Sequence, residues 1–179
     1  GDNFLLADYG DFLLDRDLAQ ETLERARGYE QSDTAFLRKV LAESALKLPA
    51  GNADIQQMAS RFRDLEQRGD NRLYAREEAR FALELQHDPT RALKLAQDNW
   101  TIQRAPEDIR IYLQAAPAAG KHASAPVVLD FLQRTRSEDP SVTAPAAETV
   151  EDIDADAPTT RTATQCTAGS PRAAWAPQL

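Results

Sequence analysis

Large apolar residues recur three and four positions apart through the first 137 residues. Two clear examples are the series Phe36, Val40, Leu41 and the series Ile109, Tyr112, Leu113. Because an α-helix turns once every 3.6 residues, this spacing places the apolar side chains on one face of a helix. No run alternates apolar and polar residues as a half-buried strand would. The pattern therefore predicts an all-α chain.

Prolines, glycines and capping residues divide this pattern into short helices. Asp88-Pro89 combines a capping residue with the first helical position, where proline is tolerated, and Ser32 can cap a helix in the same way. Glycines lie between the periodic runs, where helices commonly end. We expect eight helices, in four pairs joined by short turns, over residues 3–15, 18–28, 33–47, 53–68, 71–86, 89–102, 107–116 and 125–135.

The composition changes at residue 138. Residues 138–179 contain 10 Ala, 7 Thr and 5 Pro, few large apolar side chains, and seven acids against two arginines. Such a segment buries too little apolar surface to offset the entropy lost on ordering. We expect a folded domain over residues 1–137 and a disordered acidic tail rich in Ala, Thr and Pro over residues 138–179. An acidic interaction segment is the alternative for this tail.

The chain as a whole is acidic, with 21 Lys and Arg against 29 Asp and Glu and a net charge of −8. Binding to nucleic acid depends on the opposite balance, so we expect no nucleic-acid partner. No apolar stretch approaches the ~20 residues of a membrane span. One cysteine and two histidines offer no set of metal ligands and no nucleophile with its base. We therefore expect no catalytic residue, no metal, no cofactor and no enzymatic activity.

An arginine stripe is the most conspicuous group of charges. Arg72, Arg76 and Arg80 are four residues apart and share one helix face. They could bind a carboxylate or phosphate of a partner. Alternatively, Arg80 pairs with Glu84 one turn later and the others pair with acids of neighbouring helices. The acidic surroundings favour these internal ion pairs.

A small residue follows each predicted turn by five positions, and these residues lie 31, 39 and 33 positions apart. Ala92 follows the turn at His87 by five positions, and Ala125 follows the turn at Gly120 by five, which places the two alanines 33 residues apart. Upstream, the same step leads from Asp17 to Thr22 and from Leu48 to Ala53. A repeated helix pair cannot bury its apolar face alone, so such pairs stack and share one interior.

One segment carries a resemblance to a known family. It consists of Ala79-Arg80-Phe81-Ala82-Leu83, then Asp88-Pro89-Thr90-Arg91-Ala92-Leu93-Lys94-Leu95-Ala96, and an exit at Asn99-Trp100-Thr101-Ile102-Gln103-Arg104-Ala105-Pro106. This segment resembles a unit of the tetratricopeptide repeat (TPR) family. The resemblance covers about 130 residues, with one clear unit and two or three degenerate ones. Asp17, Leu48 and His87 depart from it, since the family usually has glycine at these turn positions.

The resemblance implies a right-handed superhelix of about four antiparallel helix pairs. An irregular helical bundle is the alternative. Abundant Ala and Arg with only four lysines suggest a bacterial member of the family. The chain begins at Gly1 and not at Met, which indicates a processed or excised chain and leaves both a cytoplasmic and an exported or periplasmic location open.

The resemblance also implies a non-enzymatic scaffold whose concave face binds a partner peptide or helix. The positions that would face it, counted back from the turns, are Asp8, Asp11, Arg38, Lys39, Tyr74, Glu77, Phe81, Glu84, Glu107, Arg110 and Gln114. Acids outnumber bases among them and two are aromatic, so we expect a basic or amphipathic protein or peptide partner. Two alternatives stay open: Phe81 belongs to the core, and the chain is a structural or self-assembling segment of a larger protein.

Overall fold

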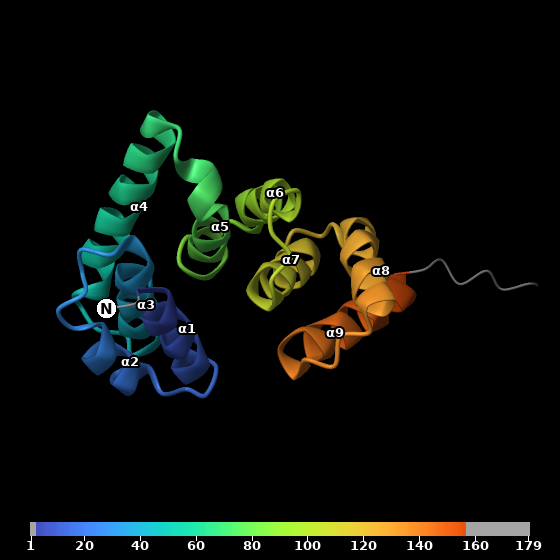
Figure 1. Ribbon diagram of the computed structural model, residues 1–179, viewed down its shortest axis with the longest axis horizontal. Coiled ribbons are helices and arrows are strands. Elements are labelled where there is room, and N and C mark those ends of the chain that lie inside the picture. The colour runs from blue at the N-terminus through green and yellow to red at the C-terminus, as the bar shows by residue number, and fades with distance from the viewer. Residues whose placement is uncertain (1–2, 157–179) are drawn as a thin grey trace, which may run out of the picture.

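The computed structural model describes residues 3–156, and over this range the chain is helical with no strand (Figure 1). The predicted all-α class is therefore confirmed for the described part of the chain. The α-helices are α1 (Asn3–Leu14), α2 (Ala19–Ala26), α3 (Asp33–Ala45), α4 (Gly51–Arg68), α5 (Ala75–Glu84), α6 (Pro89–Trp100), α7 (Pro106–Ala118), α8 (Pro126–Thr135) and α9 (Pro140–Asp156). Two short 3₁₀ helices, η1 (Asn71–Tyr74) and η2 (His122–Ser124), precede α5 and α8.

The predicted helices correspond one to one to α1–α8, with ends that differ by a few residues. Ser32 and Asp88 cap α3 and α6 as expected, since their side chains accept the backbone N–H of Ala35 and Arg91. The expected helix over 71–86 begins instead as η1. The helix expected over 107–116 continues to Ala118, with Pro117 in its last turn.

The structure corrects the predicted boundary at residue 138. Residues 140–156 form α9, which contacts α7 along the outer end of the molecule (Figure 1). One stripe of α9, spaced by three and four residues, faces the core: Val142, Ala146, Thr149 and Ile153. A low overall apolar content concealed this stripe in the sequence. Residues 157–179 of the predicted tail lie outside the described residues.

Helices contact mainly their neighbours in the chain. Each odd-numbered helix contacts the next odd-numbered one, from α1 through α3, α5 and α7 to α9, and helices consecutive in the chain also contact one another within α1–α4 and within α5–α8. The molecule is consequently elongated, with α1–α4 at one end and α8–α9 at the other (Figure 1). The odd-numbered helices thus lie side by side along its length.

Two apolar clusters form the core, and α5 belongs to both. Phe81 of α5 and Leu85, the residue that caps its C-terminus, join the cluster of α3 and α4, where Phe81 packs against Phe62 with ring centroids 5.3 Å apart. Ala79 and Ala82, on another face of α5, join the cluster of α6–α9. Trp100 anchors that second cluster, since its ring packs edge-on against the rings of Tyr112 and Phe131.

Candidate interaction groove

Four helices, α1, α3, α5 and α7, bring charged side chains to one small cavity. Its lining consists of Asp11, Arg38, Arg76, Glu77, Arg80, Glu84, Glu107, Arg110, Ile111 and Gln114. The cavity measures about 20 Å³, which is room for about one water molecule. The side chains therefore fill this space themselves, and we call them the central ion network.

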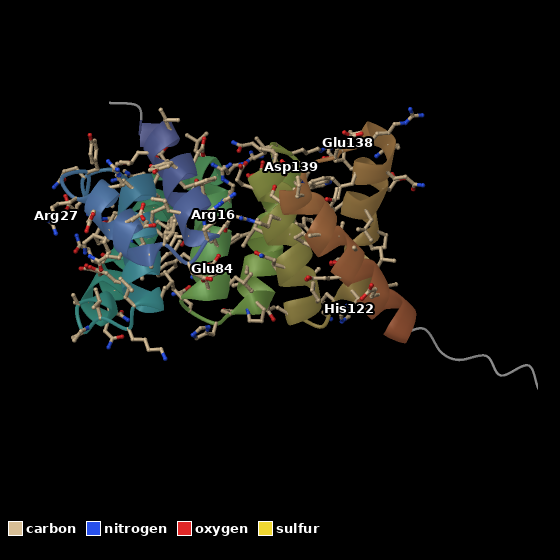
Figure 2. The ribbon with its side chains drawn as sticks, turned by 90° about the horizontal axis from the view of Figure 1, so that it is seen from below. Arg16, Arg27, Glu84, His122, Glu138 and Asp139 are labelled. Atoms are coloured by element: carbon tan, nitrogen blue, oxygen red, sulfur yellow. The ribbon has the colours of Figure 1, made fainter. Side chains whose placement is uncertain are left out.

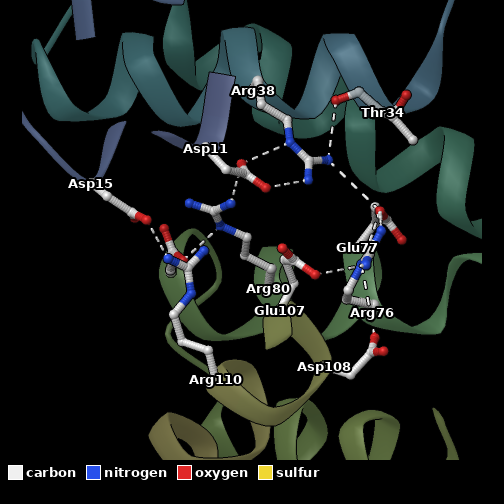
Figure 3. Close-up of polar contacts among 11 residues, drawn as sticks. Asp11, Asp15, Thr34, Arg38, Arg76, Glu77, Arg80, Glu107, Asp108 and Arg110 are labelled. Carbon is white, nitrogen blue, oxygen red and sulfur yellow. Dashed lines mark hydrogen bonds and ion pairs between the residues drawn. The ribbon is translucent and has the colours of Figure 1, made fainter. Parts of the chain in front are cut away.

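Asp11 lies at the centre of this network, where α1 meets α3 and α5 (Figure 3). Arg38 donates two hydrogen bonds to it, from Nε to Oδ1 at 2.9 Å and from Nη2 to Oδ2 at 2.7 Å. Arg80 of α5 donates to the same carboxylate. Burial by itself raises the pKa of Asp11, but the two guanidinium groups outweigh it and hold this pKa below its ordinary value. Asp11 is therefore a buried carboxylate that stays charged.

A glycine allows the close approach of α1 to α3 at this point. A Cβ atom at Gly10 would lie 2.9 Å from Cγ of Arg38, closer than side chains tolerate. Because Gly10 has no side chain, the stem of Arg38 passes directly over α1 and reaches Asp11.

The other arginines of the network are paired in the same way. Arg76 lies 3.1 Å from Glu77, 3.7 Å from Glu107 and 3.9 Å from Asp108. Arg80 also pairs with Glu84 at 2.8 Å, and Arg110 pairs with Asp15. The predicted internal pairing is confirmed for Arg80 and Glu84 and for Arg76 and the acids of α7. With every arginine of the network neutralised, the network offers no site for a free anion.

A larger groove opens beside the network, between α1, the start of α7 and the start of α9. It measures about 330 Å³ and is lined by Asp8, Asp11, Phe12, Asp15, Arg16, Glu107, Arg110, Asp139, Pro140 and Ser141. Figure 2 shows Arg16 on α1 and Asp139 before α9 on its two sides. We call it the α1–α9 groove.

The lining of the α1–α9 groove is negatively charged. It holds five carboxylates and two arginines, and both arginines are engaged within the chain. Arg110 pairs with Asp15, while Arg16 lies 3.6 Å from the ring centroid of Phe12 and donates to the Phe12 carbonyl. Asp8 is exposed and has no ion pair among the described residues. Arg16 likewise has no ion pair among the described residues, so its positive charge lies over the half-exposed ring of Phe12, near the negative charge of Asp8. With five carboxylates against two arginines, the lining as a whole stays negative.

Most of the predicted concave positions come together in the structure. Seven line the cavity of the central ion network: Asp11, Arg38, Glu77, Glu84, Glu107, Arg110 and Gln114. Asp8 lines the adjoining α1–α9 groove. Tyr74 is partly buried and lines a separate pocket at the start of α3, with Gln31 and Thr34 among its neighbours.

Two predicted positions face elsewhere. Phe81 is fully buried in the core, so a partner cannot reach it. This agrees with the alternative considered for Phe81 from the sequence, that it belongs to the core. Lys39 points to α4, where Nζ donates to Glu43 at 2.6 Å and to Asp54. Each lies one residue from a position that does face the network, Arg38 and Arg80. Because adjacent residues diverge by about 100° around a helix, Lys39 and Phe81 point away from the network although Arg38 and Arg80 face it.

The sequence prediction also missed several groove residues. Three of them, Phe12, Asp15 and Arg16, lie about one helical turn beyond Asp8 and Asp11. The helical period of the α1 sequence could therefore have predicted that they lie beside those two residues. Asp139, Pro140 and Ser141 were missed because the segment that contains them was expected to be disordered.

No family model, no curated protein and no solved structure matches this chain. Over residues 3–156, no three or more His, Cys, Asp or Glu side chains are grouped so that they could hold a metal ion. No helix in that range is long and apolar enough to cross a membrane.

Proposed function

We propose that this protein is a non-enzymatic interaction scaffold of the tetratricopeptide type, which binds a basic, amphipathic segment of a partner protein in the α1–α9 groove. The observation that carries the proposal is the groove itself: carboxylates from α1, from the start of α7 and from the residue before α9 surround a space of about 330 Å³ next to the exposed ring of Phe12.

Recurring turns support the repeat architecture, a right-handed superhelix of about four antiparallel helix pairs. A residue with positive φ follows each of α1, α3, α5 and α7: Asp17 at 58°, Lys47 at 55°, His87 at 54° and Gly120 at 65°. Three of these are the turn positions at which the tetratricopeptide pattern usually has glycine, and Lys47 is one residue from the fourth. The left-handed conformation is the one that favours glycine. Positive φ thus follows the first helix of every pair, and it also follows α2 at Gly28, α4 at Gly69 and α8 at Arg136.

Charge and shape favour a particular kind of partner. A guanidinium or ammonium group would meet the carboxylates of Asp8, Glu107 and Asp139, and an arginine can bind a carboxylate through two parallel hydrogen bonds. An apolar side chain next to that cation would pack on Pro140 and on the part of the Phe12 ring that Arg16 leaves exposed. A segment that alternates basic and apolar residues fits both requirements.

The test begins with selection of 12-residue peptides from a random display library on the full-length protein. We expect the selected peptides to combine Arg or Lys with one or two large apolar residues. Binding of one such peptide is then measured by fluorescence anisotropy. Asp8→Lys should weaken it at least tenfold, because the substitution places a cation where the peptide's cation binds.

Asp64→Lys provides the matched control. Asp64 is exposed on α4 and lies outside the groove, so the variant carries the same change in charge without the change in the groove. Equal affinities of the two variants, or selected peptides without basic residues, would show that the groove is not the binding site.

The exposed face of α1 favours a second candidate function, self-assembly. Leu5, Tyr9 and Phe12 are 66%, 41% and 47% exposed and lie on one face of the helix, with the rings of Tyr9 and Phe12 stacked. A second copy of the chain could cover this stripe. Sedimentation velocity separates the two functions, since self-assembly predicts a dimer that Tyr9→Asp abolishes, whereas the scaffold predicts a monomer at all concentrations.

A further inference from the structure

We propose that the α1–α9 groove is occupied by the chain's own segment 157–179, which binds in cis through Arg161 and Arg172 and competes with the external partner. The proposal rests on the groove of the proposed function and adds its autoinhibition. Three observations carry it: the distribution of charge along the chain, the lining of the groove, and the position of α9.

Charge is divided sharply at residue 157. Segment 157–179 contains two arginines and no Asp or Glu, whereas residues 1–156 hold 19 basic and 29 acidic residues. The segment therefore carries a charge of +2 and the rest of the chain −10. Unlike charges attract within about one Debye length, ~8 Å at physiological ionic strength, so an acidic surface that the segment can reach is favoured as its contact.

The groove is the acidic surface best suited to the two arginines. Asp8 has no ion pair among the described residues, and Glu107 lies 3.7 Å from Arg76, beyond hydrogen-bond distance, so both can accept from a further guanidinium. Trp175 follows Arg172 by three residues, so the segment also carries a large aromatic residue of the kind that would suit Pro140 in the groove. A second, larger pocket would repel the segment, because Lys94 and Lys121 line it.

The position of α9 makes this contact possible within one chain. Asp139 and Pro140, where α9 begins, line the groove, and the helix then runs 17 residues toward η2, a distance of about 25 Å (Figure 2). Residues 157–172 can span up to about 50 Å when extended, which is enough to return to the groove. A tether of this length holds the segment at an effective concentration of about 1 mM, so a contact with a Kd below about 1 mM keeps the groove mostly occupied.

The lone cysteine of the chain allows a direct test. Cys166 lies between the two arginines, so a nitroxide spin label on it reports the position of the segment without any substitution. In the ¹⁵N-labelled full-length chain, we expect the label to reduce the amide signals of residues 8–16 and 139–142 by more than half. Signals of residues 55–65 in α4 should keep their intensity. Equal signal loss in both regions, or none, would overturn the proposal.

Two further arms make the result specific. The double variant Arg161→Gln/Arg172→Gln should abolish the localised signal loss, whereas the matched double variant Arg25→Gln/Arg63→Gln, at exposed positions on α2 and α4, should retain it. In a mixture of spin-labelled ¹⁴N chain with unlabelled ¹⁵N chain, the loss should disappear. Persistence in the mixture would mean that the segment binds a second copy, which contradicts binding in cis.

The selected peptide distinguishes failure of this inference from failure of the proposed function. The Arg161→Gln/Arg172→Gln variant should bind the peptide about fivefold more tightly than the unsubstituted chain, because the competing segment has been released. Equal affinities would overturn the autoinhibition and leave the groove as a binding site. Localised signal loss without peptide binding would instead support the occupied groove and count against the external partner.

Discussion

Asp11 illustrates the energetics of single residues in this protein. A buried carboxylate is costly to desolvate, and the cost is recovered only when good partners hold it. Arg38 and Arg80 provide those partners from two other helices, and the three side chains join α1 to both α3 and α5. The removal of one charge would leave the opposite charges buried without compensation.

Asp11→Asn should therefore lower the free energy of unfolding at pH 7 by about 3 kcal/mol, as measured by urea denaturation. The pKa of Asp11 is lower in the folded than in the unfolded chain, so its contribution is complete above about pH 4 and is lost as the pH falls through the folded pKa. The variant should accordingly lose less stability than the unsubstituted chain on acidification. Asp64→Asn, at an exposed position, should change stability by less than about 0.5 kcal/mol.

Glu43 represents the opposite case. Its Oε1 accepts from Lys39, while Oε2 is buried with no hydrogen-bond partner among the described residues. Burial raises the pKa of Glu43, and the nearby carboxylate of Asp54 adds to the rise, which Lys39 only partly offsets. This carboxylate therefore destabilises the folded chain at neutral pH.

Glu43→Gln should raise the free energy of unfolding at pH 7 by about 1 kcal/mol, because an amide N–H can donate to Asp54 where the carboxylate repels it. A raised folded pKa means that protonation relieves the penalty, so the gain should disappear by about pH 4, where Glu43 is protonated in both states. Urea denaturation at the two pH values provides the measurement. A variant less stable than the parent at both values would contradict this interpretation.

At the scale of elements, the helical spacing of apolar residues was enough to predict α1–α8 from the sequence, but it did not reveal α9. The apolar residues of α1–α8 are large enough to stand out, and residues such as Asp88 mark where a helix begins. In α9 the core-facing stripe consists of small or isolated residues such as Ala146 and Thr149, among acids and prolines. Its burial depends on the surface of α7, which the local sequence does not encode.

The packing of α9 can be tested with two valines of the same helix. Val142 is fully buried, whereas Val150 is 44% exposed. Val142→Ala should lower the free energy of unfolding by about 2 kcal/mol, through lost burial and a residual cavity, and should make residues 138–156 more sensitive to proteolysis. Val150→Ala should have an effect below about 0.5 kcal/mol. Similar effects of both substitutions would show that α9 does not pack on α7 as described.

At the scale of the whole molecule, counting back from the predicted turns between paired helices identified the helix faces that share one surface. This count placed residues from α3, α5 and α7, such as Arg38, Glu77 and Arg110, around the same cavity as Asp11. It could not predict that the arginines and acids fill this cavity, because pairing depends on the distances between helices. The groove therefore lies to one side of the predicted surface, where α9 completes it.

The two apolar clusters predict unfolding in parts. Leu113 belongs to the cluster of α6–α9, and Met58 belongs to that of α3 and α4. Leu113→Ala should cost about 3 kcal/mol and reduce the hydrogen-exchange protection of α6–α9 more than that of α3 and α4. Met58→Ala should give the reverse pattern. Uniform loss of protection in both variants would mean that the molecule unfolds as one cooperative unit.

The sharing of α5 has a consequence for synthesis on the ribosome. The chain emerges from its N-terminus, so α3 and α4 are exposed before Phe81 and Leu85 complete their cluster. Leu65 precedes Leu85 by 20 residues, an interval of a few seconds at typical translation rates. During that interval Phe62 lacks its contact with Phe81, so the nascent chain exposes apolar surface that the finished fold covers.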